Sequence, residues 1–107
     1  MYKLKKSNIV WWPVTINEPT DGGLTTEHKC QIQYELLSQD EYDKIAQKGD
    51  IELLNRVVKG WQEISGTNDK PLPFTKKNTD AFYQVSFIRA SLIQGYWLAD
   101  SGAPAKN

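Results

Sequence analysis

The sequence predicts an α+β fold, with an N-terminal antiparallel β-hairpin followed by two short helices and one long C-terminal helix. Residues 9–36 predict the hairpin, because two stretches rich in β-branched and aromatic residues flank a turn signal. Residues 38–99 predict the helical part, because capping residues precede apolar residues at helical spacing. With 107 residues the chain forms one small domain, and we expect residues 1–8 and 100–107 to be loose ends.

The first predicted strand, residues 9–16, reads IVWWPVTI. Pro13 cannot donate a hydrogen bond to a neighbouring strand, so it marks an edge strand or a bulge. Strand alternation gives Trp12 to the core side and Trp11 to the opposite side, where a partner would have to bury it.

A turn signal at residues 17–23 separates this strand from a second one that ends at Leu36. Polar and apolar side chains alternate along the second strand, so one of its faces should be half-buried and the other wet. The half-buried face consists of Thr26, His28, Cys30, Ile32, Tyr34 and Leu36.

Two short helices should follow the hairpin. Ser38 can cap the first, with Glu41 completing a capping box, and Gly49 suits the end of that helix. Asp50 can cap the second helix. The apolar positions of the second helix keep helical spacing as far as Trp61, through Ile51, Leu54 and Val57 or Val58.

The long C-terminal helix is predicted to start at Thr75 and to run to Ala99. Its apolar face is wide, and we expect it to carry more apolar surface than the hairpin and two short helices can cover. Such a surplus is typical of a protein that binds other chains. The main stripe is Ala81, Val85, Ile88, Leu92, Tyr96 and Ala99, and a second row holds Tyr83, Phe87, Ala90 and Trp97 or Leu98.

Charge and the lengths of the apolar runs argue against several function classes. The 13 basic residues balance the 13 acidic ones, so no dominant field for nucleic acid or a membrane surface is expected. The lysines at positions 3, 5 and 6 should be solvated. No run reaches membrane-spanning length, the first residues lack the apolar core of a signal peptide, and the single Cys30 fits a reducing compartment. We therefore expect a soluble, cytoplasmic protein.

Catalytic chemistry has little support in the sequence. His28 and Cys30 lie two apart on one strand and are the chain's only histidine and cysteine, so no metal site is expected, and no cofactor. A small enzyme that uses this pair is an alternative, although no orienting partner is evident. Trp11 and Trp12 near the lysines suggest a nucleic-acid adaptor as another alternative, but adjacent strand residues cannot form one stacking platform.

Several short motifs follow one another along the chain. A Val-Val-Lys-Gly-Trp run ends at Trp61, a Pro-Leu-Pro-Phe run ends at Phe74, and a Thr-Lys-Lys-Asn run ends at Asn78. Phe87-Ile-Arg-Ala and then Tyr96 follow them, and Leu-Ser-x-x-Glu-Tyr precedes them at residues 37–42. This series resembles the tail assembly chaperones of long-tailed, lambda-like bacteriophages and prophages. The similarity covers residues 24 to 98 and leaves out the strand with the two tryptophans.

The resemblance implies a non-enzymatic role in the cytoplasm of a bacterial host. Chaperones of this family bind the long, apolar tape-measure protein before the tail tube polymerises around it, and they are absent from the finished virion. Self-association is expected. Many are also made as a frameshifted, longer product that recruits the tail tube protein, and residues after Asp100 would suit such an extension.

Seven residues are the candidates for the core and the partner interface together. We expect Trp61 and Phe74 to anchor the fold, and Tyr96 and Trp97 to be exposed to partners. Arg89 has two interpretations: its stem lies along apolar surface while its guanidinium reaches solvent or a carboxylate, or it makes a bidentate contact at an interface. The full set is Trp61, Phe74, Phe82, Phe87, Arg89, Tyr96 and Trp97.

Overall fold

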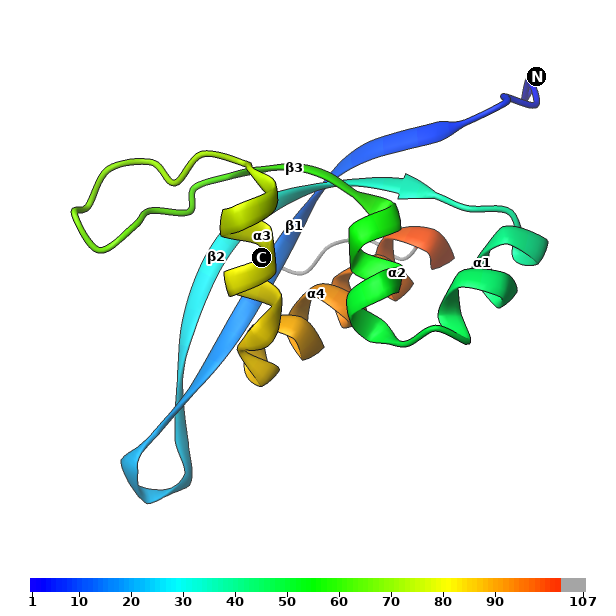
Figure 1. The fold of residues 1–107 in the computed structure, drawn as a ribbon. Helices are drawn as coiled ribbons and strands as arrows, with labels where there is room; N and C mark the ends of the chain where they lie inside the picture. The colour runs from blue at the N-terminus through cyan, green and yellow to red at the C-terminus, as the bar shows by residue number, and fades with distance from the viewer. Residues whose placement is uncertain (103–107) are drawn as a thin grey trace.

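The computed structural model describes residues 1–102 and confirms the α+β class (Figure 1). A three-stranded antiparallel sheet in the order β1-β2-β3 carries helices packed on its inner face, the face that bears Val14 and Ile32. In chain order the elements are β1 (Asn8–Thr20), the short 3-10 turn η1 (Asp21–Gly23), β2 (Leu24–Leu36), α1 (Gln39–Ala46), α2 (Asp50–Val57), β3 (Val58–Gln62), α3 (Lys76–Gln84) and α4 (Ser86–Ser101).

The predicted hairpin is confirmed and is longer than expected. β1 and β2 pair without interruption from Asn8↔Leu36 to Thr20↔Leu24, and β1 lies at the edge of the sheet, as Pro13 indicates. Gly22 and Gly23 close the turn with φ values of 78° and 77°, a left-handed conformation that glycine adopts without strain.

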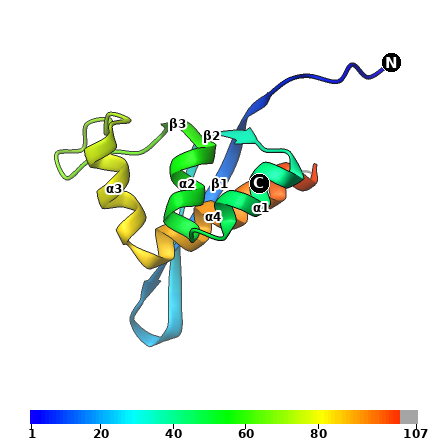
Figure 2. The same ribbon diagram turned by 45° about the vertical axis from the view of Figure 1, so that its right-hand side comes forward.

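The outer half of the hairpin projects beyond the helices as an arm, residues 17–29 (Figures 1 and 2). All of its residues are exposed except Glu18, which is half-buried. The predicted inner face is therefore buried only where helices cover it. Thr26 and His28 alternate correctly with Cys30 but lie past the end of the helical layer and are exposed, which corrects their expected burial.

The predicted end of the second helix was wrong, because α2 stops at Val57 and β3 takes the place of the expected continuation to Trp61. The β-branched Val58 begins a strand, and Trp61 pairs with Ile32 on the inner face. Gly60 pairs with Gln33, and a Cβ at Gly60 would lie 3.5 Å from the Trp11 ring. The Trp11 ring thus reaches across β2 on the outer face and covers the backbone that Gly60 leaves bare.

The long helical pattern folds as two helices. The predicted C-terminal helix is present as α4, whereas Thr75, its expected start, begins the separate helix α3. Thr75 caps α3 by accepting a hydrogen bond from the Asn78 backbone (3.2 Å). Val85 is extended (φ −81°, ψ 115°) and separates the helices. α4 continues to Ser101, two residues into the predicted tail, and residues 103–107 of that tail lie outside the described residues.

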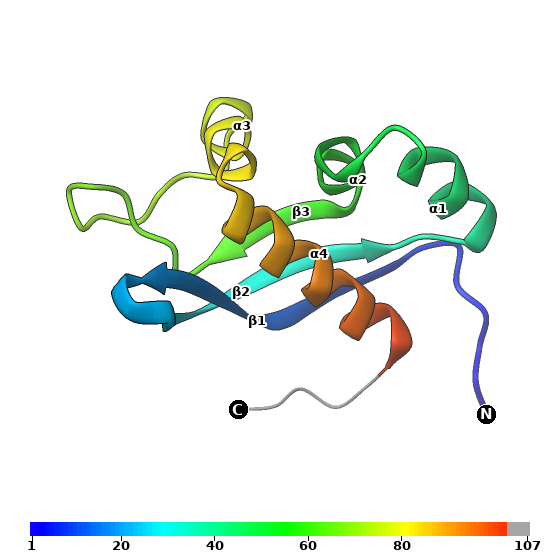
Figure 3. The same ribbon diagram turned by 90° about the horizontal axis from the view of Figure 1, so that it is seen from below.

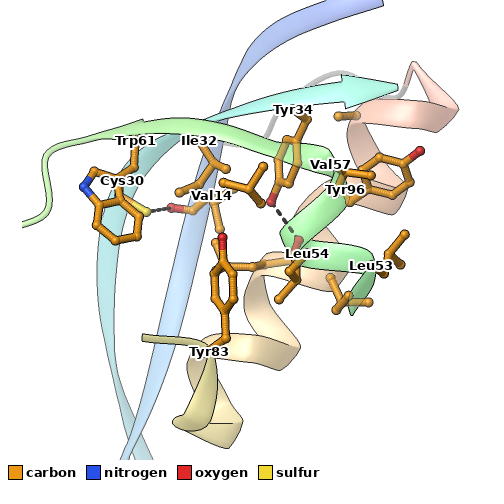
Figure 4. Packing of buried hydrophobic residues seen from close by; sticks show 14 of the residues in the cluster. Val14, Cys30, Ile32, Tyr34, Leu53, Leu54, Val57, Trp61, Tyr83 and Tyr96 are labelled. Atoms are coloured by element: carbon orange, nitrogen blue, oxygen red, sulfur yellow. Dashed lines mark hydrogen bonds between the residues drawn. The ribbon is translucent and has the colours of Figure 1, made fainter. Parts of the chain in front are cut away.

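The core lies between the inner face and the helices (Figures 3 and 4). α4 approaches the sheet closely at Gly95, where a Cβ would lie 2.7 Å from both the Tyr34 hydroxyl and Val14 Cγ2. The Tyr34 hydroxyl donates a 2.7 Å hydrogen bond to the Leu92 carbonyl. The fully buried large side chains are Tyr34, Tyr83, Tyr96, Ile32, Leu54, Leu92 and Val57.

This close packing corrects the expectation that the long helix is poorly covered by its own domain. Leu92, Tyr96 and Ala99 of the main stripe are at most 5 % exposed. The large apolar side chains that remain exposed on these two helices are Val85 at the α3–α4 junction and Trp97 and Leu98 on the outer side of α4.

Candidate partner-binding surfaces

An aromatic cluster joins β3, α3 and the proline-rich segment between them. The Trp61 ring packs edge-on against Phe74 and tilted against Phe82, with centroids 5.1 and 5.0 Å away. Trp61 Nε1 donates a 2.7 Å hydrogen bond to the Leu72 carbonyl. Trp61 is 8 % exposed and anchors the fold as predicted, whereas Phe74 packs on it and remains 40 % exposed.

Tyr96 and Trp97 occupy opposite environments, although we expected both to be exposed. Tyr96 is 1 % exposed, because its ring stacks on Tyr42 and its hydroxyl accepts a 3.0 Å hydrogen bond from the Leu37 backbone. That expectation was wrong for Tyr96. Trp97 is 54 % exposed, as predicted, and its Nε1 donates to the Tyr42 hydroxyl at 2.9 Å. Leu98, 46 % exposed, extends this apolar surface.

Arg89 has an intramolecular role at the break between the two last helices. Its Nη1 donates a 2.7 Å hydrogen bond to the Tyr83 carbonyl, near the end of α3 where helical partners for carbonyls are missing. The side chain is half-buried, and so is its neighbour Phe87. This contact fits the first interpretation of Arg89, with a backbone carbonyl in the place of solvent or a carboxylate, and a partner contact for Arg89 stays a prediction.

The outer face of the sheet carries two exposed apolar side chains that the candidate set lacks. Ile9 is 51 % exposed and Trp11 is 43 % exposed, both on β1. Strand parity was the signal for Trp11, because it placed this ring opposite the core. Both side chains are available to a partner.

A pocket of about 280 Å³ lies where the arm leaves the domain, and we call it the arm-base pocket. Its walls come from four segments that are distant in sequence: β1, β2, the loop after β3, and the α3–α4 junction. Apolar side chains form most of the interior, and two carboxylates and a histidine stand among the polar groups. The lining residues are Ile16, Glu18, His28, Lys29, Cys30, Glu63, Ile64, Ser65, Phe82, Phe87 and Ile88.

Cys30 and His28 meet at this pocket without forming a nucleophilic pair. Burial, and secondarily the charge of Glu63, raises the pKa of the Cys30 thiol to about 11. The thiol points to the Val14 carbonyl (3.6 Å; Figure 4), while His28 Nε2 is paired with Glu18 at 2.9 Å. A protonated, buried thiol is a poor nucleophile. Within residues 1–102 there is also no group of three or more His, Cys, Asp or Glu side chains that could hold a metal ion.

The two carboxylates of the pocket differ in their partners. Glu18 pairs with His28, whereas the Glu63 side chain makes no hydrogen bond or ion pair within residues 1–102. The Glu63 backbone is left-handed (φ 66°), which costs a residue with a Cβ about 1 kcal/mol. An unpaired negative charge therefore stands beside apolar walls.

The motifs that resemble tail assembly chaperones contact one another in the structure. Trp61 binds the Leu72 carbonyl, and Asn78 Nδ2 donates to the Pro73 carbonyl at 2.9 Å. These contacts give the motif residues a packing role in fastening the proline-rich segment to β3 and α3.

Comparisons with protein-family models, curated proteins and solved structures gave no match. No helix within residues 1–102 has both the length and the apolar character needed to cross a bilayer.

Proposed function

We propose that this protein is a tail assembly chaperone of a long-tailed phage or prophage, a non-enzymatic protein that binds the apolar tape-measure protein and associates with copies of itself. It would act in the bacterial cytoplasm, and a frameshifted longer form would recruit the tail tube protein. The observation that carries the proposal is the set of large apolar side chains left exposed on so small a domain. From β1 to α4 these are Ile9, Trp11, Leu24, Phe74, Val85, Trp97 and Leu98.

Exposed aromatic residues favour a binding role because they are enriched at protein interfaces, where they supply most of the contact energy. Trp11 and Trp97 lie on different elements and present separate apolar surfaces, which suits a protein with more than one partner. The two alternatives have weaker support. The Cys30 thiol lacks the activation that a nucleophile needs, and the balanced charge offers little attraction for nucleic acid.

Co-expression tests the proposal. The chain would be produced together with the tape-measure protein encoded in the same phage or prophage, and the soluble fraction would be compared with that of the tape-measure protein alone. We expect the chaperone to bring the tape-measure protein into the soluble fraction and to co-purify with it. A tape-measure protein that stays insoluble and unbound would refute the proposal.

Two surface variants show whether the exposed aromatics carry the binding. Trp97→Ser and Trp11→Thr remove exposed rings, and each should reduce the recovery of the tape-measure protein while leaving the circular dichroism spectrum unchanged. Lys77→Ser, an exposed substitution on α3, is the matched control and should retain full recovery.

A further inference from the structure

We propose that the arm-base pocket receives residues 2–6 of a second copy of this chain, with Leu4 entering the pocket and the neighbouring lysines meeting Glu18 and Glu63. The inference deepens one part of the proposed function, self-association, and is separate from the tape-measure assignment, because donor and acceptor both belong to this protein. The proposed occupant of the pocket is a segment whose apolar side chains are exposed in the isolated chain.

The donor segment has unburied apolar side chains between positive charges. Residues 1–7 precede β1 and form no helix or strand. Tyr2 is 73 % exposed and Leu4 is 93 % exposed, although both are large and apolar. Lysines stand at positions 3, 5 and 6, with no acidic residue among the first seven. In an extended segment Tyr2, Leu4 and Lys6 share one side, so two apolar side chains and one charge would face an acceptor together.

The acceptor has the complementary chemistry. Ile16, Ile64 and Ile88 are among its apolar lining residues, and a volume of about 280 Å³ lies just below the range of roughly 300–1,000 Å³ typical of small-molecule sites. That size suits one or two side chains. Glu63 has no partner within residues 1–102, and the arm holds three acidic residues, at positions 18, 21 and 27, against Lys29 alone.

Lys29 and His28 do not pair with the Glu63 carboxylate. Lys29 lines the pocket, but its strand position gives the side chain to the opposite face from Cys30. His28 already pairs with Glu18. The Glu63 carboxylate is thus available to a cation, and opposite charges across an interface fix its register and speed association.

Reach requires the donor to come from another molecule. From Asn8 to Ile16 the strand advances about 26 Å, at roughly 3.3 Å per residue, toward the pocket. Leu4 is four residues before Asn8 and can lie at most about 14 Å from it, even fully extended. Leu4 therefore cannot enter its own pocket. Figure 1 shows the start of the chain and the arm at opposite ends of the molecule. Each copy therefore carries its donor segment and its acceptor pocket on different surfaces.

A charge-swap experiment tests the proposal. The full-length protein carrying Lys5→Glu and Lys6→Glu is the donor variant, and the protein carrying Glu18→Lys and Glu63→Lys is the acceptor variant. Size-exclusion chromatography with light scattering would measure association for each variant and for their equimolar mixture. We expect each variant alone to associate about tenfold or more weakly than the wild type, and the mixture to recover most of that loss.

Two controls keep the result specific. Glu27→Lys reverses a charge on the opposite face of the arm and should leave association within about twofold of the wild type. Leu4→Ser removes the anchor from an exposed segment that cannot unfold the core, and should weaken association as strongly as the donor charges do. A wild-type protein that remains monomeric would overturn the inference, as would an equimolar mixture no better associated than its parts.

The tape-measure protein is the competing occupant of the pocket. If Glu18→Lys/Glu63→Lys lost tape-measure binding while self-association and the Leu4→Ser variant stayed like the wild type, the inference would be wrong and the proposed chaperone function would stand. If self-association depended on the swapped charges but no tape-measure binding were found, the inference would hold and the proposed function would fail.

Discussion

Replacing Gly95 with alanine tests the contact between α4 and the sheet. The added Cβ would lie 2.7 Å from the Tyr34 hydroxyl and 2.7 Å from Val14 Cγ2, closer than real Cβ contacts. Both neighbours are buried, so neither can turn into solvent. Tyr34 is also held by its hydrogen bond to the Leu92 carbonyl. The new methyl group must therefore shift α4 or break that bond.

The expected magnitude follows from three opposing terms. Helix propensity favours alanine over glycine by about 1 kcal/mol. Overpacking a well-packed core typically costs about 1–3 kcal/mol. Leaving a buried hydroxyl or carbonyl without its partner costs about 1–3 kcal/mol more. With the propensity gain subtracted, Gly95→Ala should lower the free energy of unfolding by about 3 kcal/mol.

Urea unfolding followed by circular dichroism measures this loss. Ala90→Gly, at an exposed position of the same helix, is the control and should cost only the propensity difference of about 1 kcal/mol. Adding Val14→Ala to Gly95→Ala removes one of the two clashes, so the double variant should be more stable than the sum of the single effects predicts. A Gly95→Ala protein as stable as the wild type would show that the helix does not approach the sheet this closely.

Three further predictions concern other parts of the domain. The Cys30 thiol, whose pKa burial raises to about 11, should react with a thiol reagent at pH 8 about a hundredfold more slowly than in urea-unfolded protein. The hydrogen bond from Arg56 lowers the pKa of Glu35, so this pair stabilises the fold above the ordinary carboxyl pKa, and the stabilisation is lost as pH falls through the lowered value. Between about pH 5 and pH 2 the wild type should lose up to about 1 kcal/mol more stability than Arg56→Leu. Trp11→Ala should cost about 1 kcal/mol in unfolding free energy, because the ring covers Gly60.

Each of these predictions has a contrary result. Equal reaction rates in folded and unfolded protein would mean that Cys30 is accessible. If the free energy of unfolding fell equally with pH below 5 for the wild type and Arg56→Leu, the ion pair would contribute nothing to the loss of stability in acid. For Trp11→Ala, unchanged stability would mean that the contact of the ring with the outer face does not stabilise the fold. Thr15→Ala, on the same face and strand, is the control for a small surface change.

Local chemistry made much of the fold predictable. The capping role of Ser38 is confirmed by its hydrogen bond from the Glu41 backbone (3.3 Å), and the Glu41 side chain meets the Ser38 hydroxyl at 3.5 Å instead of the backbone N–H that we expected. Thr75 likewise begins a helix where its side chain predicts one. The hairpin followed from alternation and from the glycines of its turn. Each of these features is decided within a few residues of chain.

The features that escaped prediction depend on contacts that form only in the folded chain. Val85 breaks the last helical pattern without any proline or glycine, and the compensating hydrogen bond from Arg89 to the Tyr83 carbonyl exists only after folding. The run ending at Trp61 has helical spacing, yet Trp61 belongs to a strand because Ile32 is there to pair with it.

The candidate surfaces show the same division. Trp97 and Tyr96 are adjacent aromatic residues, and Tyr96 is the buried one because its ring packs against both Tyr34 and Tyr42. The arm-base pocket draws on segments from Ile16 to Ile88, so no window of sequence could reveal it. Gly95 was the one overlooked local signal, because a glycine in the middle of a long helix often marks a close approach.

Because α4 packs against β1, the hairpin is synthesised before the helix that covers it. Val14 leaves the ribosome before the residues that cover it, around Gly95, which are translated about eighty codons later. Until then a nascent chain carries the hairpin with its inner face open to other polypeptides, including those on neighbouring ribosomes. Premature stop codons before α4 should therefore yield aggregating fragments instead of smaller folded proteins, and slow translation of α4 should lengthen the period in which the chain itself needs protection.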